Sequence, residues 1–257
     1  MHVVVYDGSF ESFLTGVFEI YEYKFQDVAI VSEKDYQKSA FGSEHFVQAN
    51  RVKADRVWAG LRQRVSGKAL SQIYKTFLSE NHQVENIILQ YLQYAFQSKT
   101  SIEYDYSHPA VLTVTKTAVK VAKEKHRMEA FVRFQLTKDK LFYATIQPDH
   151  NVLPLISGHF EKRYADQKWM IYDISRRYGI YYDLETTEMV EMNFTEEAAQ
   201  GKNIEFAIDE QETLYQQLWQ QYFSSVNIAA RRNIKLHIQH MPRRYWKFLT
   251  EKKPTGL

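Results

Sequence analysis

Basic and aromatic side chains gather near the end of this 257-residue sequence. Between residues 228 and 253, eight lysine or arginine side chains face a single acid, which gives a local charge of +7 in a chain of net charge +2. Guanidinium groups bind phosphate oxygens in pairs, and tyrosine or tryptophan rings can stack on bases. Together with an arginine further upstream, the cluster predicts nucleic-acid contacts by Arg176, Arg231, Arg232, Lys235, Arg243, Arg244, Tyr245 and Trp246.

The spacing of these residues predicts how they are presented. If residues 229–240 form one helix, Ile234 and Ile238 face the core while the basic side chains lie on the adjoining side. Pro242 stops or kinks that helix, so the second arginine pair points in a new direction. The alternative is a solvated helical face followed by an aromatic anchor, because charge runs are common on helices.

Acidic and histidine side chains near the middle of the chain form a second candidate site. Asp149, His150 and Asp173 stand at the ends of predicted elements, where they could serve as an acid–base or metal site with Arg176 stabilising phosphate charge. Ion pairs with Arg163 or Arg176 would explain the same residues as struts between sheet and helix. Further polar residues at element ends, to which no catalytic role is assigned, are Glu124, His126, Arg127, His159 and Arg163.

Asp7 is a third candidate, because it stands between a predicted strand and a predicted helix. It either caps that helix, as Ser9 also can, or acts as an acid, base or base-edge acceptor. His237 and His240 have helical i, i+3 spacing but no evident third ligand, so we expect packing or surface histidines and no metal site.

Other site classes are excluded by what the sequence lacks. It contains no cysteine, which rules out disulfides, thiolate metal sites and cysteine nucleophiles in this chain. It has no HExxH, Walker loop, GxSxG or glycine-rich dinucleotide turn. No signal peptide or membrane span is evident, so we expect a soluble, cytoplasmic protein that does not enter a membrane.

The elements that must position these residues follow from hydrophobic periodicity. The first part of the chain predicts a buried strand at residues 3–6, a helix at 10–21, short strands and loops at 25–51, and an antiparallel helix pair at 70–78 and 84–95. A helix at 109–125 follows, which Pro109 begins. Two further helices are predicted at 210–226 and 229–240.

Between these helices the sequence predicts a block of strands. Strands at 131–136 and 141–146, a helix at 148–163, and strands at 169–174, 180–184 and 189–194 give a ββαβββ order with short connections, which favours a mostly antiparallel sheet. We therefore predict an α+β fold of one compact unit, residues 1–257, with subregions 1–107, 108–195 and 196–257.

Five segments carry a resemblance to a known family. The segments YDGSFESFL, EKHRMEAFVRF, IQPDHNVLPLISGHFEKRY, WMIYDISRRYGIYYD and RRNIKLHIQHMPRRYW begin at residues 6, 124, 146, 169 and 231. Together they resemble a bacterial family of DNA-metabolism or DNA-repair proteins. Two positions depart from its pattern: Ser12 replaces a usual glycine, and Asn151 replaces a usual acid, which weakens a metal–carboxylate site near His150.

The resemblance implies a role directed at DNA. Members of that family pair with a radical-SAM DNA-modification or repair protein, and some are fused to a uracil-DNA-glycosylase-like domain. This chain lacks glycosylase-type motifs, so we expect no glycosylase activity. The resemblance implies that the radical-SAM partner carries the iron–sulfur cluster and SAM, while this chain needs no cofactor.

Three functions therefore remain open from the sequence. The first is a DNA-binding repair or modification factor that uses the basic cluster. The second is an enzyme acting on DNA or nucleotides through Asp149, His150 and Asp173. The third is a non-catalytic module that docks the radical-SAM partner through an aromatic surface.

Overall fold

The protein is described as a computed structural model, which covers residues 2–38, 43–191, 238, 241–249 and 252. The chain divides into two compact units, Met1–Ala122 and Lys123–Leu257. The sequence predicts one compact unit with subregion boundaries at residues 107 and 195, whereas the observed division falls within a long helix. Both units combine helices with a sheet, so the α+β class is confirmed.

Unit 1 is built on a small parallel sheet. Strands β1 (His2–Tyr6), β2 (Val28–Ser32) and β3 (Ser43–Phe46) lie in the order β2-β1-β3, and β1 pairs in parallel with both neighbours. After β1 the chain turns at Gly8, whose φ of +93° suits a residue without Cβ. Helix α1 (Phe10–Glu22) then begins, with the Ser9 hydroxyl accepting the Ser12 N–H at 3.1 Å.

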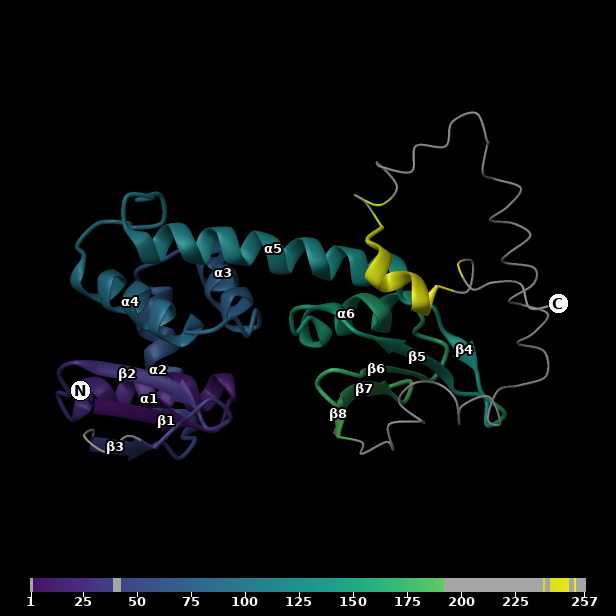
Figure 1. The fold of residues 1–257 in the computed structure, drawn as a ribbon, viewed down its shortest axis with the longest axis horizontal. Helices are drawn as coiled ribbons and strands as arrows, with labels where there is room; N and C mark the ends of the chain where they lie inside the picture. The colour runs from purple at the N-terminus through teal and green to yellow at the C-terminus, as the bar shows by residue number, and fades with distance from the viewer. Residues whose placement is uncertain (1, 39–42, 192–237, 239–240, 250–251, 253–257) are drawn as a thin grey trace. The chain divides into compact units, whose positions relative to one another are not determined.

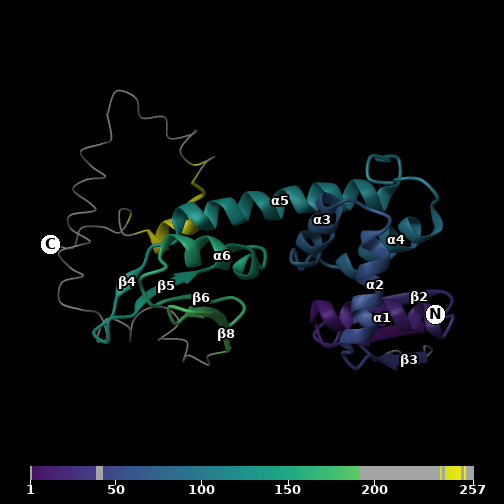
Figure 2. The same cartoon turned by 180° about the vertical axis from the view of Figure 1, so that it is seen from behind.

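Three helices complete the core of unit 1: α2 (Arg51–Arg62), α3 (Gly67–Phe77) and α4 (Val84–Gln97) (Figures 1 and 2). The apolar stripes predicted for the helix pair are buried through Ile73, Ile88 and Leu92. They pack into the same cluster as Phe13 and Val17 of α1. The amphipathic spacing thus correctly predicts which faces turn inward.

Helix α5 runs over Pro109–Phe131, six residues beyond the predicted end at Lys125. The prediction is wrong here because the buried stripe does not stop at Val121 but continues to Met128, which is also buried. Lys125 and Glu129 form an i, i+4 ion pair at 2.5 Å that supports the added turn. The predicted strand at 131–136 is correspondingly reduced to β4 (Gln135–Leu136).

Unit 2 contains the predicted ββαβββ block. After β4 come β5 (Phe142–Ile146), α6 (Leu153–Arg163), β6 (Trp169–Asp173), β7 (Tyr178–Tyr182) and β8 (Thr187–Glu191), and the strands lie side by side in chain order. Only β5 and β6 pair in parallel within this described sheet, because the α6 crossover joins them. Figure 1 shows α6 lying along the sheet.

The described C-terminal residues form a short 3₁₀ helix, η3 (Arg243–Phe248), directly after Pro242. With three residues per turn, Arg244 and Lys247 fall on one side of η3 while Tyr245 and Phe248 fall on another. The helices predicted at 210–226 and 229–240 lie outside the described residues. Across the described ranges, no helix combines the length and apolarity needed to cross a membrane.

Candidate functional site: a cationic pocket in unit 2

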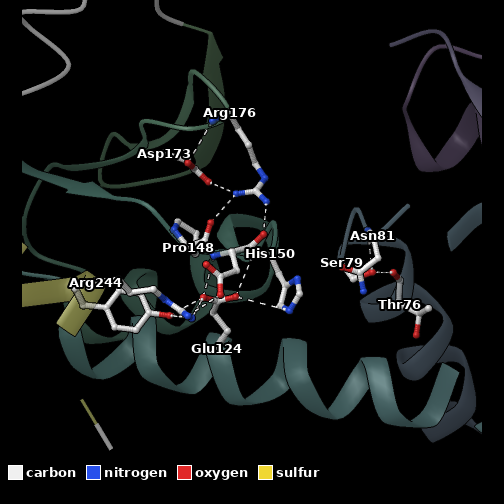
Figure 3. A network of polar contacts seen from close by, with 11 residues as sticks. Thr76, Ser79, Asn81, Glu124, Pro148, His150, Asp173, Arg176 and Arg244 are labelled. Atoms are coloured by element: carbon white, nitrogen blue, oxygen red, sulfur yellow. Dashed lines mark hydrogen bonds and ion pairs between the residues drawn. The ribbon is translucent and has the colours of Figure 1, made fainter. Parts of the chain in front are cut away.

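Glu124 is the polar centre of unit 2. It lies on the buried stripe of α5 between Val121 and Met128, and only 2% of its surface is exposed. Its carboxylate accepts the backbone N–H groups of Asp149 and His150, each at 2.9 Å. It also accepts the Tyr245 hydroxyl at 2.5 Å and pairs with Nη2 of Arg244 at 2.9 Å, as Figure 3 shows. One carboxylate thus joins α5, the 148–150 segment and η3.

These contacts determine the protonation of Glu124. Burial raises its pKa, but the Tyr245 hydroxyl, the two backbone N–H groups and the nearby His150 together lower the pKa below its ordinary value. Burial and the bond to Glu124 raise the pKa of Tyr245, so its hydroxyl keeps its proton. Glu124 is therefore a charged hydrogen-bond acceptor, and its described partners are groups of the protein itself.

Asp173 and Arg176 hold the same segment from the side of the sheet. Asp173 is fully buried at the end of β6, where it accepts the N–H groups of Ser175 and Arg176 and pairs with Arg176 Nη1 at 2.8 Å. Burial raises the pKa of Asp173, and Arg176 with the two N–H groups opposes that rise. Arg176 in turn donates to the carbonyl oxygens of Pro148 and Asp149 at 3.2 and 3.1 Å.

This arrangement also explains why α6 begins later than predicted. The predicted helix at 148–163 is wrong over residues 148–152, where the chain bends at Asp149 and His150 and the N–H groups of these two residues are bonded to Glu124. Helix α6 starts at Leu153, with Pro154 at its second position, where a missing N–H costs nothing.

A pocket of about 590 Å³ opens beside the 148–150 segment. Arg244 on its wall donates to the Asp149 carboxylate at 2.7 Å, and these side chains are 41% and 54% exposed. Lys247 donates to the Gln147 side chain. We call this the cationic pocket, because it contains four basic side chains and one carboxylate among its lining residues Gln147, Pro148, Asp149, Ser175, Arg176, Arg243, Arg244 and Lys247.

The predicted catalytic trio is only partly brought together. Asp149 lines the cationic pocket, whereas Asp173 is buried behind it as the partner of Arg176. His150 is not a lining residue, and its Nε2 lies 4.0 Å from Glu124 Oε2. The strut interpretation of Asp173 with Arg176 thus describes the observed contacts.

The two predicted stacking residues of η3, Tyr245 and Trp246, differ in burial. Tyr245 is 2% exposed, and its ring lies under the Arg244 guanidinium at 4.6 Å. The Trp246 ring faces both Arg243 and Lys252, at 5.8 and 5.1 Å, and its Nε1 donates to the Met241 carbonyl at 3.0 Å. Tyr245 is therefore a core residue, while Trp246 has two cations near its ring.

The other predicted polar residues stand apart from the cationic pocket. His126 and His159 both approach Glu129, at 3.9 and 3.8 Å. Arg163 lies over the Tyr164 ring at 5.7 Å, and Arg127 is on α5. None of these four residues lines the pocket.

Asp7 belongs to unit 1, where its carboxylate accepts the Ser9 N–H at 2.8 Å in the turn before α1. Arg231, Arg232, Lys235, His237 and His240 lie outside the described residues. In the part of the chain that the structure describes, no group of three histidine, aspartate or glutamate side chains is arranged to hold a metal ion.

Sequence reasoning gave no role to Glu124 and none to Gln147 or Ser175. A signal for Glu124 exists, because it continues the spacing of Val114, Ala118 and Val121 as a carboxylate on an otherwise apolar stripe. A buried acid requires bonding partners, so such a position marks a polar centre. The predicted helix at 109–125 includes Glu124, but its predicted apolar stripe ends at Val121. Gln147 and Ser175 have no comparable signal.

Fold and site together define a protein with a cationic pocket on an α+β unit. The chain belongs to the family described as Domain of unknown function (DUF4130), whose model matches residues 82–251. Among solved structures it is similar to a pGpG-specific phosphodiesterase, PggH, from Vibrio cholerae. That match has a TM-score of 0.36 and 11% identity, and covers 70% of this chain and 80% of that chain. Similarity this low gives no information about activity. No curated protein matches the chain.

Proposed function

We propose that this protein binds DNA through the sugar–phosphate backbone, with phosphate groups held in the cationic pocket. The single observation that carries the proposal is the convergence of Arg176, Arg243, Arg244 and Lys247 on one hollow. A phosphate oxygen accepts charge-assisted bonds from such donors, and arginine can supply two at once.

Two of the arginines are held in place before any ligand arrives. Glu124 fixes one side of Arg244, and Asp173 fixes Arg176. A guanidinium that is already ordered loses less side-chain entropy when it binds an anion. Arg243 and Lys247 supply the additional charge, since no carboxylate of the described residues forms an ion pair with either of them.

The lining of the cationic pocket favours phosphate over base. None of its lining residues is aromatic, so a base would find no aromatic ring to stack on there. Contacts to phosphate and sugar position a protein on DNA without reading sequence. We therefore expect binding with little sequence preference, and we expect Arg231, Arg232 and Lys235 to add further phosphate contacts.

A DNA titration at several salt concentrations tests this proposal. Each phosphate contact adds about 0.9 to the slope of log affinity against log salt. Replacing both Arg243 and Lys247 with glutamine should therefore weaken binding and lower the slope by about 1.8. The double replacement of Lys162 and Lys168 by glutamine, at exposed positions that do not line the pocket, is the matched control. The proposal would be overturned by binding that does not depend on salt, or by equal binding of the wild type, the Arg243 and Lys247 double variant and the control variant.

We further propose that the protein acts in DNA repair or modification together with a radical-SAM partner. The five sequence segments support this part of the proposal. Because the chain has no cysteine, the iron–sulfur cluster would belong to the partner. Co-purification with and without nuclease treatment tests it: a complex that survives nuclease supports direct docking, and no complex under either condition contradicts it.

Catalysis has less support than binding. Of the three acid–base candidates, only Asp149 lines the cationic pocket, while Asp173 is fully buried in its ion pair. An enzyme would be indicated by turnover of a damaged or abasic oligonucleotide that is lost in His150→Ala. If no such substrate is turned over, with or without divalent metals, the catalytic hypothesis is contradicted and only the binding function remains.

A further inference from the structure

We infer that the cationic pocket takes the terminal phosphate of a DNA strand, and that this phosphate displaces the Asp149 carboxylate from Arg244. The inference rests on the proposed function and specifies its ligand as a phosphomonoester rather than an internal phosphodiester. The inference starts from the ion pair between the Asp149 carboxylate and Arg244 in the pocket.

The Asp149 carboxylate occupies the place that a phosphate oxygen would take. Its Oδ2 lies 2.7 Å from Arg244 Nη1, while Nη2 of the same guanidinium bonds Glu124 at 2.9 Å. Arg244 is thus held from the interior by one carboxylate and covered on the pocket side by another. An anion from solvent can replace the second without disturbing the first.

The contacts of Asp149 allow this exchange. Its backbone N–H is bonded to Glu124 at 2.9 Å and its carbonyl to Arg176 at 3.1 Å, so the backbone stays in place without help from the carboxylate. The carboxylate itself is more than half exposed. Ion pairs in such exposed settings are weak, because water screens the charges, so they are easy to displace.

The balance of charge favours a phosphomonoester. Arg243 and Lys247 have no carboxylate partner among the described residues, and they line the same pocket as Arg244. An internal phosphate carries one negative charge and two ester groups. A terminal phosphate carries a charge of about −1.5 to −2 at neutral pH and three free oxygens. It can therefore replace Asp149 on Arg244 and still bond both other cations.

The test compares oligonucleotides that differ only at one end. Fluorescence anisotropy would measure the binding of a strand with a 5′-phosphate, a 3′-phosphate or two hydroxyl ends, with the dye placed internally. A hydroxyl-ended strand one nucleotide longer controls for added charge. We expect about tenfold tighter binding of a phosphate-ended strand, equivalent to one added charge-assisted contact. The two phosphate positions show which end is used.

Two variants separate the pocket from a general charge effect. The double replacement of Arg243 and Lys247 by glutamine should abolish the preference for the phosphate end. Asp149→Asn should tighten the hydroxyl-ended strand more than the phosphate-ended strand and so reduce the ratio between them. Asp166→Asn removes an exposed acid that does not line the pocket and should leave the ratio unchanged.

Failure of this inference differs from failure of the proposed function. If hydroxyl-ended and phosphate-ended strands bind equally, yet binding still depends on salt and on Arg243 and Lys247, the terminal-phosphate inference is overturned while DNA binding stands. A preference that survives the double replacement overturns the inference as well. If no strand binds in a salt-dependent way, both proposals fall.

Discussion

Two buried glutamates, one in each unit, are held in different ways. Glu19 of α1 is 8% exposed, and the described contacts of its carboxylate are to side chains: His45 at 2.7 Å and Lys53 at 2.8 Å. Glu124 of α5 is 2% exposed and accepts two peptide N–H groups as well as Tyr245 and Arg244. The first joins neighbouring elements, whereas the second holds the 148–150 segment and Arg244, which line the cationic pocket.

The two glutamates differ in whether their partners keep another acceptor when the glutamate is removed. Without Glu19, Lys53 still pairs with Glu22 at 2.7 Å. Without Glu124, the N–H groups of Asp149 and His150 and the buried Tyr245 hydroxyl all lose their acceptor. Unsatisfied buried donors are costly, so a glutamate that binds backbone should be harder to replace than one that binds side chains.

The largest expected effect is therefore the contrast between Glu124→Ala and Glu19→Ala. We expect the first to lower the opening free energy of unit 2 by about 3–5 kcal/mol, because several buried donors and a cation lose one partner. We expect the second to lower that of unit 1 by about 1–2 kcal/mol. Amide hydrogen exchange, followed in peptides from each unit, measures the two values separately. Equal losses would contradict the comparison.

A smaller effect is expected from deleting one hydroxyl in each unit. Tyr245 donates to Glu124 at 2.5 Å and Tyr6 donates to Glu85 at 2.9 Å, and both tyrosines are 2% exposed. Tyr245→Phe should cost about 1–2 kcal/mol and Tyr6→Phe less than about 1 kcal/mol, since half-buried Glu85 can turn to water. Denaturant titration, followed by amide hydrogen exchange in peptides from each unit, tests whether Tyr245→Phe costs more stability than Tyr6→Phe. A costlier Tyr6→Phe would reverse it.

The smallest effect concerns pH. For Glu19, as for Glu124, burial raises the pKa, but hydrogen bonds and nearby charges lower it below the ordinary 4.5. A lowered pKa contributes stability that is present above the unfolded value and is lost as pH falls through the folded value.

The stability of each wild-type unit should therefore fall below about pH 4.5. Glu124→Gln should flatten this fall in unit 2 only, and Glu19→Gln in unit 1 only. Amide hydrogen exchange, measured between pH 3 and pH 6 and corrected for the intrinsic exchange rates, checks the expectation for each variant. An unchanged slope in either variant would show that the glutamate is not charged in the folded protein.

Local pattern predicts much of the fold. The stripe of α1, the α3 and α4 pair and the ββαβββ order all follow from periodicity, because each depends on neighbours within a few turns or one hairpin. The end of α5 also follows from local pattern, since its buried stripe continues to Met128. The start of α6 could not be predicted in this way, because it follows a segment in which Asp149 and His150 bond Glu124, 25 and 26 residues earlier in the chain.

The candidate site shows the same limit. Residue type assigns Arg243 and Arg244 to one predicted site and Asp149 to another, with Arg176 named in both, whereas these four residues line one pocket. Composition cannot show that Tyr245 is buried or that buried Asp173 forms an ion pair with Arg176, since the burial of both residues depends on packing between distant segments. An aromatic residue next to an arginine pair indicates base stacking and core anchoring equally well.

The peptide groups of the 148–150 segment are held from both sides by residues outside it. Glu124 takes the N–H groups of Asp149 and His150, while Arg176 takes the carbonyls of Pro148 and Asp149. The shape of this segment is thus uncoupled from the identity of the side chain at position 149. Evolution or a protein engineer can exchange that side chain for a base, a nucleophile or a neutral group, and so change the chemistry of the pocket without rebuilding its frame.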